Sequence, residues 1–196
     1  MERVIDELEA DQFAVDSTLS DLTAGDGMPP GFNPNSHFAP GVPRLRTLLV
    51  GLSSRAAGGD SDDAADVARV AEIMHLAVVI HDAALGRQGG RRRRVARRLI
   101  RGSAHWLGGN HLSLRALELA RAVPSPEVLG EAMDTMRELA EGHALSEDLR
   151  HRDATEADYR EYAESHSGAL YSFCTRAGGH LGGADRSTIG ALGRYG

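Results

Sequence analysis

At residues 71–82 the chain reads AEIMHLAVVIHD, and this stretch decides the fold. From residue 73 to residue 80 it is apolar on every side of a helix, which is typical of a central helix buried by its neighbours. The helix is predicted over about residues 62–85, because Asp60-Ser61-Asp62-Asp63 supplies caps and negative charge at its start and Gly86 follows its end. The sequence therefore predicts a helical core organised around this element.

Helical patterns continue on both sides of the central stretch. Apolar residues recur three or four positions apart, and no segment shows the sustained alternation of a half-buried strand. Further helices are predicted at Arg44–Ala57, at Arg91–Arg101, which Gly102 ends, and from Gly109-Asn110 to just before Pro124. A fourth helix follows the cap Ser125-Pro126-Glu127, a fifth follows the capping box of Thr155 and Asp158, and a last one is predicted at Arg186–Arg194. The predicted fold class is all-α.

The first forty residues differ from the rest of the chain. Residues 1–22 carry an interrupted helical pattern, and residues 24–43 contain enough glycine and proline to break any regular element. We therefore expect two parts: an N-terminal helix with a Pro/Gly-rich loop at residues 1–40, and a helical domain at residues 41–196.

Composition narrows the class of protein. The formal net charge of −6 argues against a generally basic nucleic-acid binder, and the single cysteine, Cys174, excludes an internal disulfide. All 22 basic residues are arginine, which excludes a Walker A phosphate loop and a Schiff-base lysine. The acidic first residues are unlike a signal peptide, and the longest clean apolar run, Leu76–Ile80, is too short to span a bilayer. We expect a cytoplasmic protein without a membrane span.

Several short motifs follow one another in an order that is found in a known enzyme family. They are Gly41-Val42-Pro43-Arg44-Leu45-Arg46-Thr47, the stretch from Glu72 to Asp82, Arg91-Arg92, Leu107-Gly108-Gly109-Asn110-His111-Leu112, Arg137–His143 and Tyr162–Leu170. Their order resembles that of the polyprenyl (trans-isoprenyl) diphosphate synthases over roughly residues 41–196. The resemblance implies an isoprenoid (terpenoid) synthase-like helical bundle, truncated before that family's second aspartate-rich motif.

The chain departs from the family pattern where the family places its charged groups. In the family, carboxylates hold Mg²⁺ ions that neutralise the leaving diphosphate of an allylic substrate. Asp82 remains from the first aspartate motif, whose other two aspartates are replaced by Ala83 and Gly86. One carboxylate is a poor Mg²⁺ site, because this ion requires several oxygen ligands in octahedral geometry. Asn110 and His143 stand where the family has acidic residues. Pro43 stands where the family has a diphosphate-binding lysine, and His166 stands where it has a later lysine.

A retained fold with lost carboxylates indicates a scaffold that folds and packs without performing this reaction. The resemblance therefore implies a non-catalytic, degenerate subunit of a heteromeric trans-prenyl diphosphate synthase, present as a homodimer or as a heteromer with a catalytic synthase. One alternative is a divergent prenyltransferase or terpene synthase-like enzyme that acts on prenyl diphosphates with a single aspartate, arginines and histidines. Another alternative is an isoprenoid- or lipid-binding protein.

Two groups of side chains are candidates for the site. The arginines expected to bind a diphosphate through charge-assisted hydrogen bonds are Arg44, Arg46, Arg91 and Arg92. The alternative for the dense arginines of residues 91–101 is that they form a solvated helix face. The resemblance places a second group toward a central cavity: His75, His81, Asn110, His143 and His166. No residue is assigned a catalytic role, and Asp82 is the remnant carboxylate and candidate metal ligand. Mg²⁺ is expected only if a partner or a residual site supplies further ligands.

The histidines and Asp82 allow two interpretations. Neutral imidazoles suit Zn²⁺, Ni²⁺ or Cu²⁺ better than Mg²⁺, so the histidines are either ligands of a transition metal or hydrogen-bonded core residues. Asp82 and His75 lie seven residues apart on one face of the central helix. They are either a remnant polar site or a hydrogen-bonded pair of core residues. Cys174, in the last apolar stripe, is expected to be a small core residue.

Overall fold

The computed structural model describes residues 16–17, 44–59, 63–85 and 94–196 of the chain. Every regular element in these ranges is helical, which confirms the predicted all-α class. The elements are α2 (Leu45–Ala56), α3 (Ala64–Ala84), α4 (Arg94–Ala122), α5 (Pro126–Asp148), α6 (Glu156–Ala163), the π-helical segment η2 (Glu164–Gly168), α7 (Ala169–Leu181) and α8 (Arg186–Tyr195). Apart from residues 16–17, the helix and loop expected at residues 1–40 lie outside the described residues.

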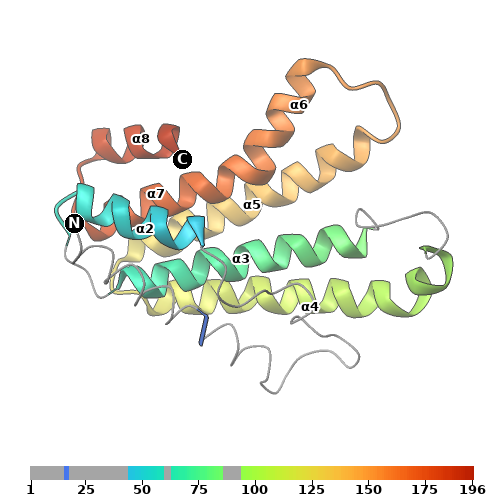
Figure 1. The fold of residues 1–196 in the computed structure, drawn as a ribbon, viewed down its shortest axis with the longest axis horizontal. Helices are drawn as coiled ribbons and strands as arrows, with labels where there is room; N and C mark the ends of the chain where they lie inside the picture. The colour runs from blue at the N-terminus through green and yellow to red at the C-terminus, as the bar shows by residue number, and fades with distance from the viewer. Residues whose placement is uncertain (1–15, 18–43, 60–62, 86–93) are drawn as a thin grey trace.

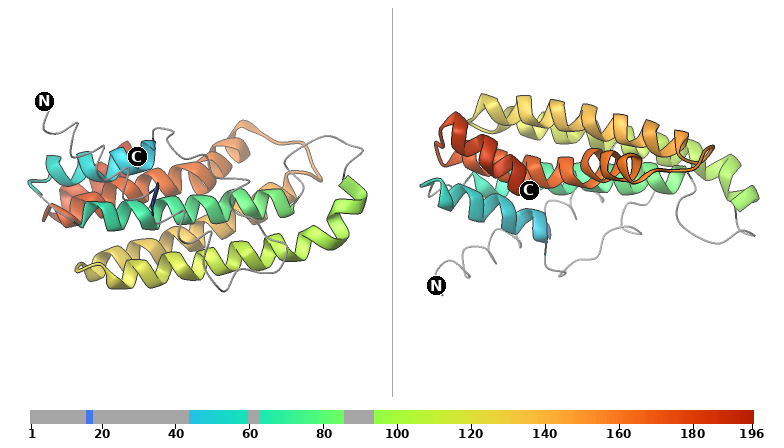
Figure 2. Two further views of the ribbon diagram at one scale, coloured as in Figure 1. Left: turned by 60° about the horizontal axis from the view of Figure 1, so that its bottom comes forward. Right: turned by 90° about the horizontal axis from the view of Figure 1, so that it is seen from above.

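The long helices lie side by side and form a bundle (Figures 1 and 2). α3 contacts α2, α4, α5 and α7, which explains why its sequence is apolar on all sides. α6, η2 and α7 follow one another without a break and form one long rod that runs along α5. α2 and α8 pack on α7 near one end of the bundle.

Residues of α3 form the centre of the hydrophobic core. Ile73, Met74 and Ile80 have no exposed surface, which confirms the burial predicted from their pattern. Burial of one such side chain contributes about 1.5–3 kcal/mol to stability. The core continues into the neighbouring helices through Leu112, Val128, Phe173 and the fully buried Cys174. Among the residues that the structure describes, no helix combines the length and the apolar character needed to cross a bilayer.

The prediction of two separate helices between residues 91 and 124 is wrong. α4 runs unbroken from Arg94 to Ala122, so neither Gly102 nor Gly109 interrupts it. A glycine inside a helix costs about 1 kcal/mol relative to alanine. The packing of α4 along α3 outweighs this local cost, because it buries Leu112, Ala116 and Ala120 in the common core.

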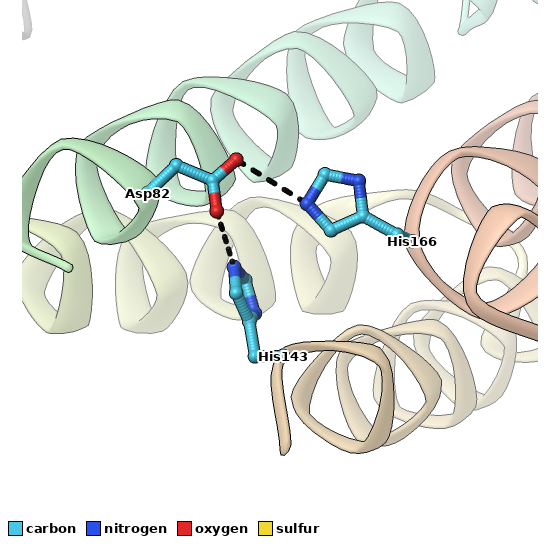
Figure 3. Close-up of side chains that lie close together, drawn as sticks. All are labelled: Asp82, His143 and His166. Carbon is cyan, nitrogen blue, oxygen red and sulfur yellow. Dashed lines mark ion pairs between the residues drawn. The ribbon is translucent and has the colours of Figure 1, made fainter. Parts of the chain in front are cut away.

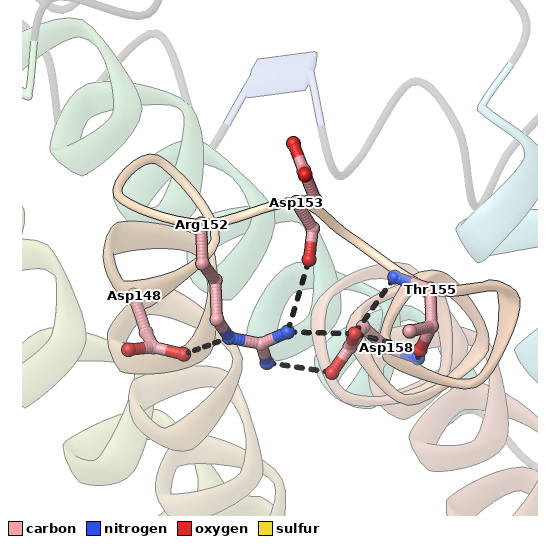
Figure 4. A network of polar contacts seen from close by, with 5 residues as sticks. All are labelled: Asp148, Arg152, Asp153, Thr155 and Asp158. Carbon is pink, nitrogen blue, oxygen red and sulfur yellow. Dashed lines mark hydrogen bonds and ion pairs between the residues drawn. The ribbon is translucent and has the colours of Figure 1, made fainter.

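The turn between α5 and α6 is fixed by one arginine (Figure 4). Arg152 donates through Nε to Asp148 at 2.8 Å and through its two terminal nitrogens to Asp158 at 2.8 and 2.6 Å. This fork, together with hydrogen bonds from Thr155, holds the pKa of the Asp158 carboxyl far below its usual range. The predicted capping box is present, since Thr155 Oγ1 accepts from the Asp158 amide and the Asp158 carboxylate accepts from the Thr155 amide. These contacts fix the start of α6 relative to the end of α5.

Candidate functional site

Asp82 lies near the C-terminal end of α3, between two histidines that come from other elements (Figure 3). Its Oδ1 lies 3.4 Å from Nε2 of His143 on α5, and its Oδ2 lies 3.3 Å from Nε2 of His166 on η2. The side chains of the three residues are 14–17% exposed, so they are largely shielded from solvent. The structure thus joins three of the sequence candidates into one group, which we call the Asp82 cluster.

Two local features bring the histidines to Asp82. His166 lies in η2, where the π-helical turn is wider than the α-helical turns before and after it; such turns are frequent at functional sites. On α5, Gly142 directly precedes His143, and a Cβ at this glycine would lie 2.8 Å from Ser165 Oγ and 3.2 Å from the backbone nitrogen of His166. The missing side chain therefore allows α5 and η2 to approach closely beside the cluster.

A cavity of about 150 Å³ adjoins the cluster. Its polar lining includes Arg46, His75, Asp82, His166 and Tyr171, and the remaining lining is mostly apolar. Burial, and then the positive charges of Arg46 and Arg44, lower the pKa of His75 from 6.5 to about 4. His75 is therefore neutral at pH 7, and Arg46 brings a positive charge to the cavity wall.

A row of aromatic rings passes through the cluster. The ring centroids are 5.0 Å apart for Tyr162 and His166, 5.3 Å for His166 and His143, 5.9 Å for His143 and His81, and 5.0 Å for His81 and Trp106. The contacts come from α4, α3, α5, α6 and η2, so the cluster lies where these elements meet. This packing restricts the rotation of both imidazoles that face Asp82.

The His81 ring contacts the His143 ring, and Asn110 lies within hydrogen-bonding reach of His81. Burial, and then the nearby His143, lower the pKa of His81, while a hydrogen bond with the Asn110 side chain opposes this shift. Neither His81 nor Asn110 is among the residues that line the cavity. The structure thus places His75 and His166 on the cavity wall, and His143 in the cluster beside it.

The two candidate diphosphate-binding arginines at the start of α2, Arg44 just before it and Arg46 within it, contact a buried carboxylate. Glu72 Oε2 lies 3.0 Å from Arg46 Nη2 and 3.3 Å from Arg44 Nη1, and the Glu72 side chain is only 1% exposed. Arg44 also donates through Nε to Asp16 at 2.5 Å. Arg91 and Arg92, the other two candidates, lie outside the described residues.

Sequence reasoning did not assign a role to Glu72 or to Tyr171. A signal for Glu72 existed, because a carboxylate in the middle of an all-round apolar helix requires a positively charged partner. Tyr171 carried no such signal, because an aromatic residue in a helix is more often a packing residue than a substrate contact, yet it lines the cavity.

The donor set of the Asp82 cluster does not fit Mg²⁺. This ion binds oxygen ligands in near-octahedral geometry, whereas the cluster offers one carboxylate and two imidazole nitrogens. The resemblance to Mg²⁺-dependent synthases therefore does not extend to the donors at this position.

Comparison with known proteins agrees with the motif order. The sequence pattern of the family described as "Polyprenyl synthetase" matches residues 33–196. The short chain isoprenyl diphosphate synthase of Methanothermobacter thermautotrophicus is 34% identical over 162 residues, which are 80% of this chain and 50% of that protein. The geranylgeranyl diphosphate synthase of Methanosarcina mazei is 31% identical over 163 residues, with the same coverage.

A solved structure of a polyprenyl synthase has the same fold. The polyprenyl synthase of Caulobacter crescentus, described as complexed with calcium and isoprenyl diphosphate, superposes with a TM-score of 0.82 at 29% identity. The match covers 99% of this chain and 60% of that one. The chain spans about half the length of the curated relatives it matches. On the family match, the sequence identity and the shared fold, this chain belongs to the polyprenyl synthetase family.

Proposed function

We propose that this chain is a non-catalytic subunit of a trans-prenyl diphosphate synthase complex, where it shapes or stabilises a catalytic partner. The observation that carries the proposal is the environment of Asp82. This carboxylate faces His143 and His166, at a position where the resemblance implies a set of Mg²⁺-binding carboxylates.

The charge requirement of the reaction supports a non-catalytic role. Ionisation of an allylic diphosphate leaves a diphosphate whose negative charge must be neutralised in the transition state. Loss of a single stabilising donor typically slows an enzyme by about 10²–10³-fold. Here Ala83 follows Asp82 in place of a second carboxylate, and Arg44 and Arg46 already bind Glu72.

Exposed apolar side chains support contact with a partner. Leu107 and Leu114, seven residues apart on α4, are 59% and 63% exposed, and Met133 on α5 is 57% exposed. Residues seven apart lie on one face of a helix. Burial of these side chains against a second protein would stabilise the complex at about 25 cal/mol per Å² of apolar surface.

The experiment is co-purification with a catalytic prenyl diphosphate synthase from the same source, followed by analysis of product chain length. We expect a stable complex whose products differ in length from those of the catalytic synthase alone. A chain that neither binds such a synthase nor changes its products contradicts the proposal. Turnover of a prenyl diphosphate by the purified chain would favour a divergent prenyltransferase, and co-purified lipid without turnover would favour a binding protein.

A further inference from the structure

The donor set of the Asp82 cluster matches a class of metal ion different from Mg²⁺. One oxygen of Asp82 and one ring nitrogen each of His143 and His166 lie within 4.8 Å of one another. Two imidazoles and one carboxylate suit Zn²⁺, Co²⁺, Ni²⁺ or Fe²⁺, because these ions accept nitrogen as well as oxygen ligands. Three protein ligands with an open fourth position are typical of zinc sites that bind water or another small ligand.

The imidazole–carboxylate distances within the cluster are longer than those of charge-assisted hydrogen bonds. Charge-assisted N–H···O bonds usually measure about 2.7–2.9 Å, whereas the two imidazole–carboxylate distances are 3.3 and 3.4 Å. Zinc–ligand bonds of about 2.0–2.1 Å place neighbouring ligands of a tetrahedral ion about 3.3 Å apart. The two observed distances end on different oxygens of Asp82, and one ligand atom from each residue lies within 4.8 Å of the other two, so small side-chain rotations would bring all three onto one ion.

The side chains around the cluster shield it from bulk solvent, while the adjoining cavity leaves room for a further ligand of the ion. The cluster side chains are at most 17% exposed, and the row of rings from Tyr162 to Trp106 restricts the imidazoles. Asp82 and His166 also line the cavity of about 150 Å³, which is large enough for water or a small anion beside the ion.

We propose that Asp82, His143 and His166 bind one divalent transition-metal ion of the Zn²⁺ class, with an open coordination position toward the cavity. The ion replaces Mg²⁺ as the cation that this part of the fold prefers. The inference concerns these three side chains and holds independently of whether the chain acts alone or with a partner.

The test is titration of the metal-free protein with Co²⁺ and Zn²⁺. We expect one Co²⁺ per chain, with visible absorption bands of the intensity typical of four-coordinate cobalt, and displacement of Co²⁺ by Zn²⁺ but not by excess Mg²⁺. Because the cluster contains no cysteine, the bound Co²⁺ should show no sulfur-to-cobalt charge-transfer band. The variants His143→Ala, His166→Ala and Asp82→Asn should each weaken binding about 100-fold or more, since loss of even an outer partner costs about 10–100-fold.

A matched control separates this site from adventitious binding to histidine. His180 Nε2 lies 3.2 Å from Glu131 Oε1, so this pair is also a histidine–carboxylate contact but has only one imidazole. His180→Ala should leave the stoichiometry and affinity unchanged. The proposal is overturned if the wild-type protein binds no Co²⁺ or Zn²⁺ at micromolar concentrations. It is equally overturned if the three cluster variants, shown by circular dichroism to be folded, bind as tightly as the wild type.

Discussion

Replacement of Gly142 by alanine tests how the Asp82 cluster is assembled. A Cβ at this position would lie 2.8 Å from Ser165 Oγ, 3.1 Å from the Ser165 carbonyl carbon and 3.2 Å from the His166 nitrogen. Two of these contacts are with backbone, so α5 and η2 must move apart. Overpacking of this kind costs about 1–3 kcal/mol, while removal of a glycine from a helix interior contributes about 1 kcal/mol in the opposite direction. The net expectation is a loss of about 1 kcal/mol.

Gly130→Ala is the matched control on the same helix. In the part of the chain that the structure describes, no atom beyond its chain neighbours and its own helix backbone lies within 4 Å of a Cβ at Gly130, so this variant gains helix propensity without a clash. The free energy of unfolding from urea titrations should therefore be about 1–3 kcal/mol lower for Gly142→Ala than for Gly130→Ala. Gly142→Ala should also weaken Co²⁺ binding, which Gly130→Ala should not. A Gly142→Ala protein as stable as the control would refute the close approach of α5 and η2.

Three further predictions concern buried polar groups. Glu72→Gln should destabilise the protein by about 3–5 kcal/mol in urea titrations, because it removes the buried carboxylate that the largely buried Arg44 and Arg46 share. A loss below about 1 kcal/mol would contradict a structural ion pair. His75 has a folded-state pKa of about 4 against 6.5, so between these pH values the unfolded chain binds more protons. Stability should therefore fall as the pH drops from 6.5 to 4, by about 3 kcal/mol from this residue, and an unchanged pH profile in His75→Gln would refute this assignment. Burial raises the pKa of the Cys174 thiol, so a thiol reagent at pH 8 should label it only upon unfolding, and rapid labelling of the native protein would contradict its position in the core.

Most of the helical framework could be predicted from local patterns. The all-round apolar stretch of α3 identified the centre of the core, and Thr155 with Asp158 identified the start of α6. Local reasoning failed in α4, where Gly102 and Gly109 indicated interruptions that the packing against α3 overrides. Propensities describe the isolated segment, whereas this helix is stabilised by the surface that it buries.

The site could be predicted as a set of residues but not as a geometry. The resemblance pointed to Asp82, His143 and His166 one at a time, and nothing in their spacing indicated that both imidazoles face the same carboxylate. That contact depends on the π-helical turn at η2 and on the close approach at Gly142, and both are results of tertiary packing. Local propensity gave no indication of the π turn, because its residues continue the same helical pattern.

The turnover of the purified chain tests the central claim most directly. The protein is incubated with Mg²⁺, a labelled isopentenyl diphosphate and an allylic diphosphate, and elongated product is counted against a buffer control and an Asp82→Asn control. We predict no elongation by the wild-type chain above either control, because Asp82 faces two imidazoles instead of further carboxylates. Elongation at an ordinary enzymic rate, on the order of 1 per second, that disappears in Asp82→Asn would contradict the account.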